Sequence, residues 1–259
     1  MIMELIDSHT HLYLDEFADD RTEVVARAGD ADVTKLLLPN IDSSTIKAML
    51  KMSDDFPGTC YPMMGLHPTS VKENYLEELA VVKQWLGKRK FIAVGEIGID
   101  LYWDTTYKRE QEDAFEQQLK LALEHDLPVV IHARDSFREI YDVLDRAWQD
   151  GMKGVFHSFT GNLDDVKKIR DYDFYFGLNG ILTFKNSGLD RVVPAIPKER
   201  IILETDSPFL APVPRRGRRN ESAYVRFVAE TLAGILQMKF DDVARLTTAN
   251  AEKLFNITI

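Results

Sequence analysis

Near its N-terminal end the chain reads Leu5-Ile-Asp-Ser-His-Thr-His-Leu12, an apolar segment that closes with His9 and His11. This pattern predicts a β-strand, and residues two apart on a strand point to the same side. Both imidazoles would then face one point, as the ligands of a divalent ion do. Because a His-x-His sequence also occurs by chance, the rest of the chain decides whether this interpretation holds.

Seven further apolar, β-branched segments follow, each ending in polar residues or glycine. They cover residues 35–40, 60–68, 91–100, 127–133, 154–160, 174–181 and 201–208. Most are separated by segments of helical periodicity, the clearest at 106–126, and two more helices are expected at 221–237 and 240–255. Near-continuous apolar strands alternating with helices indicate a parallel sheet covered on both sides. Eight such units predict an α/β fold, a single-domain (β/α)8 TIM barrel over residues 1–259.

The composition excludes some classes of protein. A formal net charge of −10 argues against non-specific coating of nucleic acid, although a local basic patch could still bind phosphate. The single cysteine, Cys60, rules out an internal disulfide and fits a reducing compartment. There is neither a basic-then-apolar signal pattern nor an apolar run long enough to span a membrane. We expect a soluble cytoplasmic monomer with no membrane contact and no obligate protein partner.

Histidines and carboxylates stand at the ends of the predicted strands. Besides His9 and His11 they are His67, Glu96, His132, His157, Glu204 and Asp206, whereas the sixth histidine, His125, falls at a polar helix end. Active sites of (β/α)8 barrels are built at these strand ends. Any one of these residues could be a hydrogen-bonded core side chain, but together they are costly to bury unless paired or metal-bound. The set therefore predicts a metal centre.

Six of these residues are predicted to hold two divalent ions: His9, His11, Glu96, His132, His157 and Asp206. One catalytic zinc usually takes three protein ligands, so six ligands suit two ions that share a bridging carboxylate. Glu96 is the natural bridge, with His9, His11 and Asp206 on one ion and His132 and His157 on the other. Asp206 is expected to orient a water or accept its proton, so Asp206 and Glu96 are the catalytic candidates. The sequence leaves the metal open among Mg²⁺, Mn²⁺ and Zn²⁺.

Over essentially its whole length the chain resembles the TatD-like deoxyribonucleases, a branch of the amidohydrolase-type metal-dependent hydrolases. The resemblance rests on Asp7-Ser-His-Thr-His-Leu12, Gly65-Leu-His-Pro68, Gly95-Glu-Ile-Gly-Ile-Asp100, Pro128-Val-Val-Ile-His-Ala-Arg134, His157-Ser-Phe-Thr-Gly161, Glu204-Thr-Asp-Ser-Pro208 and the loop 209–220. It implies a metal-dependent barrel hydrolase acting on DNA phosphodiesters, often described as an exonuclease, and the same ligand set. Many amidohydrolase relatives bridge their metals with a modified lysine, where this chain has Glu96.

Four residues are predicted to contact the substrate: His67, Arg134, Arg215 and Arg216. The two later arginines belong to Pro214-Arg-Arg-Gly-Arg-Arg-Asn220, a basic loop in an acidic protein that would meet a phosphate backbone. The alternative is a solvated loop whose arginines pair with surface acids. Arg134 would bind phosphate or pair with Asp135. His67 would contact the substrate, donate a proton, or support a metal ligand.

Other residues are expected to support the site. Glu204 would orient a ligand histidine, and Asp100 and Asp7 would either do the same or cap strand ends. Tyr102 and Trp103 follow the fourth strand, where they would stack on a base or pack beneath a loop.

The function expected is removal of nucleotides from DNA ends by a metal-dependent phosphodiesterase. One rival is a small-molecule hydrolase of amides, lactones or phosphoesters at the same site, because fold alone does not fix the substrate. The second rival is a non-catalytic metal-binding interaction protein. The arginine loop favours nucleic acid, a narrow apolar pocket would favour the first rival, and metal binding without hydrolysis would favour the second.

Overall fold

Eight parallel strands succeed one another in chain order within two sheets of the computed structural model, which describes residues 4–257. One sheet holds β1 (Leu5–Asp7), β2 (Val33–Leu38) and β3 (Cys60–Pro62). The other holds β4 (Val94–Asp100), β5 (Val129–Arg134), β6 (Gly154–Phe156), β7 (Tyr175–Leu178) and β8 (Ile201–Leu203). The α/β class and the order of the strands agree with the prediction.

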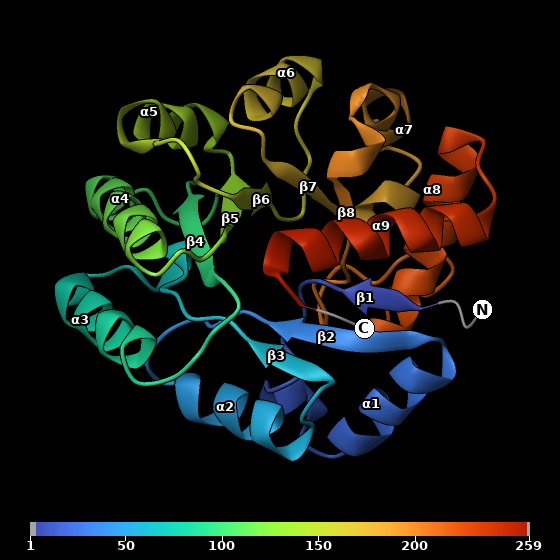
Figure 1. Ribbon diagram of the computed structural model, residues 1–259, viewed down its shortest axis with the longest axis horizontal. Helices are drawn as coiled ribbons and strands as arrows, with labels where there is room; N and C mark the ends of the chain where they lie inside the picture. The colour runs from blue at the N-terminus through green and yellow to red at the C-terminus, as the bar shows by residue number, and fades with distance from the viewer. Residues whose placement is uncertain (1–3, 258–259) are drawn as a thin grey trace.

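Helices lie outside the strands, as Figure 1 shows. They are α1 (Arg21–Asp30), α2 (Ile46–Asp55), α3 (Tyr75–Leu86), α4 (Lys108–Glu124), α5 (Phe137–Ala147), α6 (Leu163–Asp171), α7 (Leu189–Val192), α8 (Val225–Leu236) and α9 (Phe240–Phe255). Short 3-10 helices occupy Asp15–Phe17, Pro68–Ser70, Gly180–Thr183, Val193–Ala195, Lys198–Arg200 and Ser222–Tyr224. The predicted helices at 106–126, 221–237 and 240–255 correspond to α4, α8 and α9. In α4, Phe115, Leu119 and Ala122 are buried, which is the apolar face that the periodicity predicts.

The two sheets meet at two seams rather than in one closed ladder. One isolated bridge pairs Thr10 with Ser207, and another pairs Met64 with Val94. The α/β class is thus confirmed, whereas closure of the predicted (β/α)8 barrel into one eight-stranded sheet stays a prediction. Regular pairing stops early: β1 ends at Asp7 instead of residue 12, and β8 ends at Leu203 instead of residue 208.

One end of the ring is closed by the C-terminal helix. A cluster of apolar residues takes one member from, or next to, every strand: Ile6, Leu37, Met63, Ala93, Val130, Val155, Tyr175 and Ile202. Ala251, Leu254 and Phe255 of α9 complete this cluster. Figure 1 shows α9 lying across the ring on the side that faces the viewer. Ala93, Val130 and Tyr175 lie at or near the amino ends of β4, β5 and β7, so the carboxyl ends of these strands open on the opposite side.

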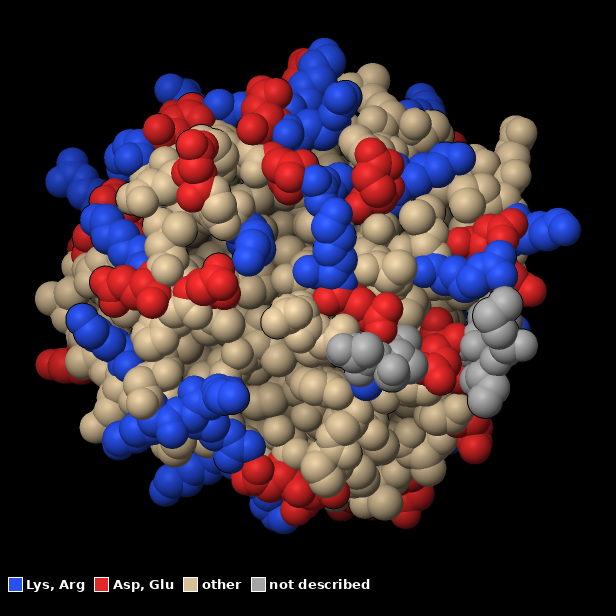
Figure 2. All heavy atoms as spheres, viewed as in Figure 1, with Lys and Arg blue, Asp and Glu red and all other residues tan. Residues whose placement is uncertain are grey.

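The face that α9 covers offers no uniform charge. In Figure 2 basic and acidic side chains are interspersed over this face, including near its centre. Among residues 4–257, no helix combines the length and the apolar character needed to cross a membrane. The polar side chains that the sequence analysis singled out lie at the other end of the strands.

Candidate metal centre

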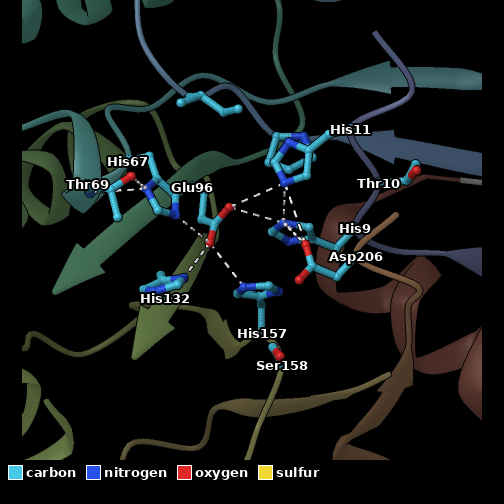
Figure 3. A network of polar contacts seen from close by, with 12 residues as sticks. His9, Thr10, His11, His67, Thr69, Glu96, His132, His157, Ser158 and Asp206 are labelled. Atoms are coloured by element: carbon cyan, nitrogen blue, oxygen red, sulfur yellow. Dashed lines mark hydrogen bonds and ion pairs between the residues drawn. The ribbon is translucent and has the colours of Figure 1, made fainter. Parts of the chain in front are cut away.

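Glu96 stands at the centre of the site, inside β4 and almost fully buried. Its Oε1 lies 2.8 Å from Nδ1 of His132, 3.0 Å from Nε2 of His157 and 3.2 Å from Nε2 of His67. Figure 3 shows these three imidazoles on one side of the carboxylate. One carboxylate oxygen therefore meets histidines from the chain after β3, from β5 and from the chain after β6.

The other oxygen of Glu96 faces a second group. Its Oε2 lies 3.1 Å from Nε2 of His9 and 3.7 Å from Nε2 of His11. The two Nε2 atoms are 3.2 Å apart, and Oδ1 of Asp206 lies 3.8 Å from the first and 3.6 Å from the second. Figure 3 shows Asp206 beside the two histidines. Glu96 thus connects two sets of ligand atoms, as a bridge between two ions must.

The outer contacts of the histidines show which nitrogens face the centre. Nε2 of His132 lies 2.9 Å from Oδ2 of Asp100, and Nδ1 of His157 lies 3.2 Å from Oε1 of Glu204. Each imidazole can donate its N–H to that outer carboxylate, which leaves the lone pair of the other nitrogen directed at Glu96. Lone pairs that face a carboxylate at about 3 Å repel unless a cation lies between them. The donor set therefore fits a divalent cation.

Tyr13 orients His11 in the same way, and the sequence analysis missed it. The Tyr13 hydroxyl donates to the carbonyl of Pro39 at 2.5 Å and lies 2.8 Å from Nδ1 of His11. Because its only hydrogen goes to Pro39, Tyr13 accepts from Nδ1–H, and Nε2 of His11 keeps its lone pair toward the site. A tyrosine two residues after a histidine carries no general signal of this role, so the sequence offered no means to find it.

Three groups of ligand atoms among residues 4–257 could hold a metal ion. Each group has its atoms within 4.8 Å of one another, and they comprise His9, His11 and Asp206; His9, Glu96 and His157; and His67, Glu96 and His132. The first group is the set expected for one ion. In the second half of the site His67 joins Glu96 and His132, although the sequence analysis expected His67 to contact the substrate.

Electrostatics in the site favour positive charge between the carboxylates. Burial would lower the pKa of His132, but the carboxylates of Asp100 and Glu96 raise it above its usual value. Burial likewise opposes a rise at His157, yet Glu96 and Glu204 hold its pKa well above the ordinary range. For Glu96 burial acts to raise the pKa, and the surrounding imidazoles bring it well below the ordinary range. The negative potential of these carboxylates stabilises positive charge, whether a proton or a divalent ion carries it.

The strand-end expectation needs correction in detail. His9 and His11 do not belong to a strand, because β1 ends at Asp7. Instead, backbone bonds across the seam fix them: the Asp206 N–H donates to the carbonyl of His9 at 2.9 Å, and the His11 N–H donates to the carbonyl of Ser207 at 2.8 Å. Asp206 itself adopts a left-handed φ of 58°. His67 likewise lies beyond β3, which ends at Pro62.

Asp7 supports the seam rather than an imidazole ring. Its carboxylate accepts hydrogen bonds from the backbone N–H of Thr205 at 2.8 Å and from the Thr205 hydroxyl at 2.6 Å. It also accepts from the backbone N–H of His9 at 3.4 Å. Burial raises the pKa of Asp7 to about 7, against the effect of these bonds. The suggestion that Asp7 orients a ligand ring is therefore replaced by a role at the junction of β1 and β8.

A pocket of about 420 Å³ lies over the metal centre. Besides the histidines and carboxylates, its lining comprises Ile41, Thr69, Trp103, Arg134, Phe209 and Leu210. Of the four residues expected to contact the substrate, His67 and Arg134 line this pocket, whereas Arg215 and Arg216 do not.

The arginine loop packs beside the pocket on neighbouring aromatic rings. The guanidinium carbon of Arg216 lies 3.8 Å from the centre of the Phe184 ring, and that of Arg215 lies 5.4 Å from the Tyr224 ring. Arg219 pairs with Asp20 at 2.7 Å. Stacking thus places Arg215 and Arg216 outside the pocket lining, and their contact with a phosphate backbone stays a prediction. Arg219 follows the alternative of pairing with surface acids.

Comparison with known proteins matches this chain over nearly its full length. The model of a family described as TatD related DNase covers residues 6–256. The relative named "Uncharacterized metal-dependent hydrolase YabD" of Bacillus subtilis is 36% identical over 98% of this chain and 99% of its own. The "3'-5' ssDNA/RNA exonuclease TatD" of Citrobacter rodentium is 32% identical over 98% and 99%. Among solved structures, the TatD homolog YJJV of Escherichia coli K12 superposes with a TM-score of 0.93 at 28% identity, covering 100% of both chains.

Proposed function

Because the chain belongs to the family of TatD-related DNases, which includes metal-dependent hydrolases, we propose that it removes nucleotides from the end of a DNA strand by metal-dependent hydrolysis of phosphodiester bonds. The observation that carries this proposal is the Glu96 carboxylate, whose two oxygens face separate sets of histidines. These two sets of residues would hold two divalent ions, which would supply charge stabilisation for a displacement at phosphorus. Relatives named as 3'-5' exonucleases support digestion from the 3' end.

In this proposal His9, His11 and Asp206 would hold one ion, His132 and His157 would hold the second, and Glu96 would be shared between them. When bound, divalent ions supply charge neutralisation at the phosphate and lower the pKa of water. Mg²⁺, Mn²⁺ and Zn²⁺ are all candidates, and the histidine-rich donor set favours a transition metal on affinity.

Asp206 is the proposed proton acceptor for the attacking water. It lines the pocket, and its side chain is 14% exposed, so a water in the pocket can reach it. Burial acts to raise the pKa of Asp206, but the nearby imidazoles of His11, His157 and His9 bring it below the usual value. The carboxylate is therefore ionised at neutral pH and free to accept a proton.

His67 and Arg134 are the proposed substrate contacts within the pocket. Nε2 of His67 points toward Glu96, and its Nδ1 lies 2.7 Å from the Thr69 hydroxyl. These two contacts fix the orientation of the ring. From there it can contact a phosphate oxygen or give a proton to the leaving oxygen. Arg134 adds a positive charge at the rim.

The test is digestion of end-labelled single-stranded DNA by metal-stripped protein to which Mg²⁺, Mn²⁺ or Zn²⁺ is returned separately. We expect a ladder that starts from one end, needs an added metal and disappears in the Asp206→Asn variant. Parallel assays with end-labelled RNA and with DNA labelled at the opposite end give the sugar preference and the polarity. Absence of cleavage with every metal would overturn the proposal.

A second candidate function follows from the walls of the pocket. Ile41, Trp103, Phe209 and Leu210 make much of the lining apolar, and about 420 Å³ suits one compact ligand. This observation favours hydrolysis of a small phosphoester or lactone. In that case the metal-loaded protein would hydrolyse such compounds while leaving oligonucleotides intact, a result that separates it from the exonuclease.

A further inference from the structure

Arg134 lies where the metal pocket meets a second cavity. As the last residue of β5, it lines both the pocket of about 420 Å³ and an adjoining cavity of about 1050 Å³ beside α5. Its side chain is exposed, and no carboxylate among residues 4–257 forms an ion pair with it. An arginine left unpaired in a chain of net charge −10 keeps its N–H groups available for an anion.

Two aromatic rings hold the Arg134 guanidinium in place. Its central carbon lies 3.8 Å from the centre of the Tyr102 ring and 5.2 Å from the centre of the Trp103 ring. Stacking of this kind fixes the plane of the guanidinium while leaving its N–H edge free. Its direction is therefore set before any ligand arrives.

Trp103 and Tyr102 are unusually exposed for aromatic side chains. Trp103 is 70% exposed and Tyr102 is 54% exposed, so neither is packed beneath a loop. Their ring centres lie 4.9 Å apart with the rings nearly perpendicular. Trp103 also lines the metal pocket. An exposed indole at the mouth of a site offers a flat apolar surface on which another ring can stack.

Tyr102 and Trp103 are connected to the metal centre through Asp100. One oxygen of Asp100 accepts the backbone N–H groups of Tyr102 at 3.0 Å and Trp103 at 3.3 Å. Its other oxygen lies 2.9 Å from Nε2 of His132. A single buried carboxylate thus sets the aromatic pair at a fixed position relative to a metal ligand.

We propose that Tyr102, Trp103 and Arg134 form a subsite for the nucleotide next to the scissile phosphate, with Arg134 on a backbone phosphate and Trp103 stacked on the base. This inference rests on the proposed exonuclease function and names the part of the strand that the pocket mouth recognises. Only an unpaired base exposes its face, so the subsite selects single-stranded ends over duplex ends.

The experiment measures binding by fluorescence anisotropy of a labelled single-stranded oligonucleotide with phosphorothioate linkages, using the full-length, metal-loaded protein. Trp103→Ala should raise Kd roughly tenfold, and Trp103→Phe should restore most of the affinity because a ring is kept. Arg134→Ala should reduce the slope of log K against log salt by about 0.7. Arg134→Lys should recover the slope without the full affinity, because lysine cannot lie flat on the rings.

Matched controls separate this subsite from general surface effects. Arg138→Ala removes an exposed arginine that lines the larger cavity but not the metal pocket, and Trp148→Ala removes a half-exposed indole at the end of α5. Both should bind like the wild type. If wild-type protein digests the unmodified oligonucleotide while Trp103→Ala and Arg134→Ala bind the phosphorothioate form with unchanged Kd, the subsite is refuted and the exonuclease stands. If wild-type protein digests no oligonucleotide, the proposed function fails and the subsite with it.

Discussion

Tyr13 determines which nitrogen of His11 faces the metal centre, so a single hydroxyl should govern metal affinity. Tyr13→Phe removes the acceptor for Nδ1–H and frees the ring to change its tautomer. We expect the affinity for the metal to fall roughly ten- to hundredfold, the usual effect of losing an outer partner of a ligand. Metal titration by calorimetry measures it. Tyr61→Phe is the matched control, since its hydroxyl contacts Lys35 and Gly58 away from the site. Equal affinities in both variants would exclude the role of Tyr13.

Glu96 is the residue on which the two halves of the site depend. Glu96→Gln keeps the shape of the side chain but removes the charge that faces the five imidazoles. We expect turnover to fall by more than roughly a hundredfold, which is the effect of removing a residue that orients a metal ligand. We also expect fewer metal ions bound per chain. Elemental analysis and DNA digestion measure the two effects. Wild-type turnover in this variant would contradict the bridged arrangement.

At the scale of elements, α1 and the arginine loop are joined by a cluster of ion pairs. Asp20, which precedes α1, accepts from both Arg219 and Arg27, and Arg27 also pairs with Glu221. The hydrogen bond from Arg219 lowers the pKa of Asp20 to about 2 from 3.8; burial opposes this shift, and the hydrogen bond from Arg27 adds to it. Since the folded-state value is depressed, the stabilisation is complete above pH 4 or so and is lost as pH falls toward about 2.

The Asp20→Asn variant tests this cluster through its pH dependence. We expect the free energy of unfolding to fall by about 1 kcal/mol near neutral pH, a value reduced for solvent because Asp20 is one-third exposed. The difference from wild type should shrink toward zero between about pH 4 and pH 2. Chemical denaturation across this range measures it. Asp19→Asn, at an exposed neighbouring position, should show no such trend, and a pH-independent difference for Asp20→Asn would contradict the assignment.

Elements could be predicted from the sequence better than their ends. Apolar runs and periodicity indicated the order of the strands and the helices α4, α8 and α9, because burial imposes those patterns directly. The same runs extended β1 and β8 too far, since apolar content does not reveal where Asp206 turns into a left-handed conformation. The ligand residues came together because strand order alone brings them to one end. The position of Arg215 and Arg216 depends on which rings they stack against, which no local pattern encodes.

At the scale of the whole molecule, α9 closes the ring and should carry a large share of its stability. Phe255 is almost fully buried in the apolar cluster at the end of the strands that α9 covers. Phe255→Ala should lower the free energy of unfolding by about 3–5 kcal/mol, because it removes a large buried side chain and leaves a cavity. Lys253→Ala, on the exposed side of the same helix, should change it by less than about 0.5 kcal/mol. Urea denaturation compares the two, and similar values would contradict the closing role of α9.

Asp100 also has a consequence for how the molecule responds to its ligands. It holds His132 with one oxygen and the backbone of Tyr102 and Trp103 with the other, so order at either side is transmitted to the other through one rigid group. Thermodynamic reciprocity then requires equal effects in both directions. A metal that orders His132 raises the affinity for a strand end by the same factor by which the strand end raises the affinity for the metal. Under the proposed exonuclease function, a chain without its metal would release DNA more readily, and DNA would protect the chain against chelators.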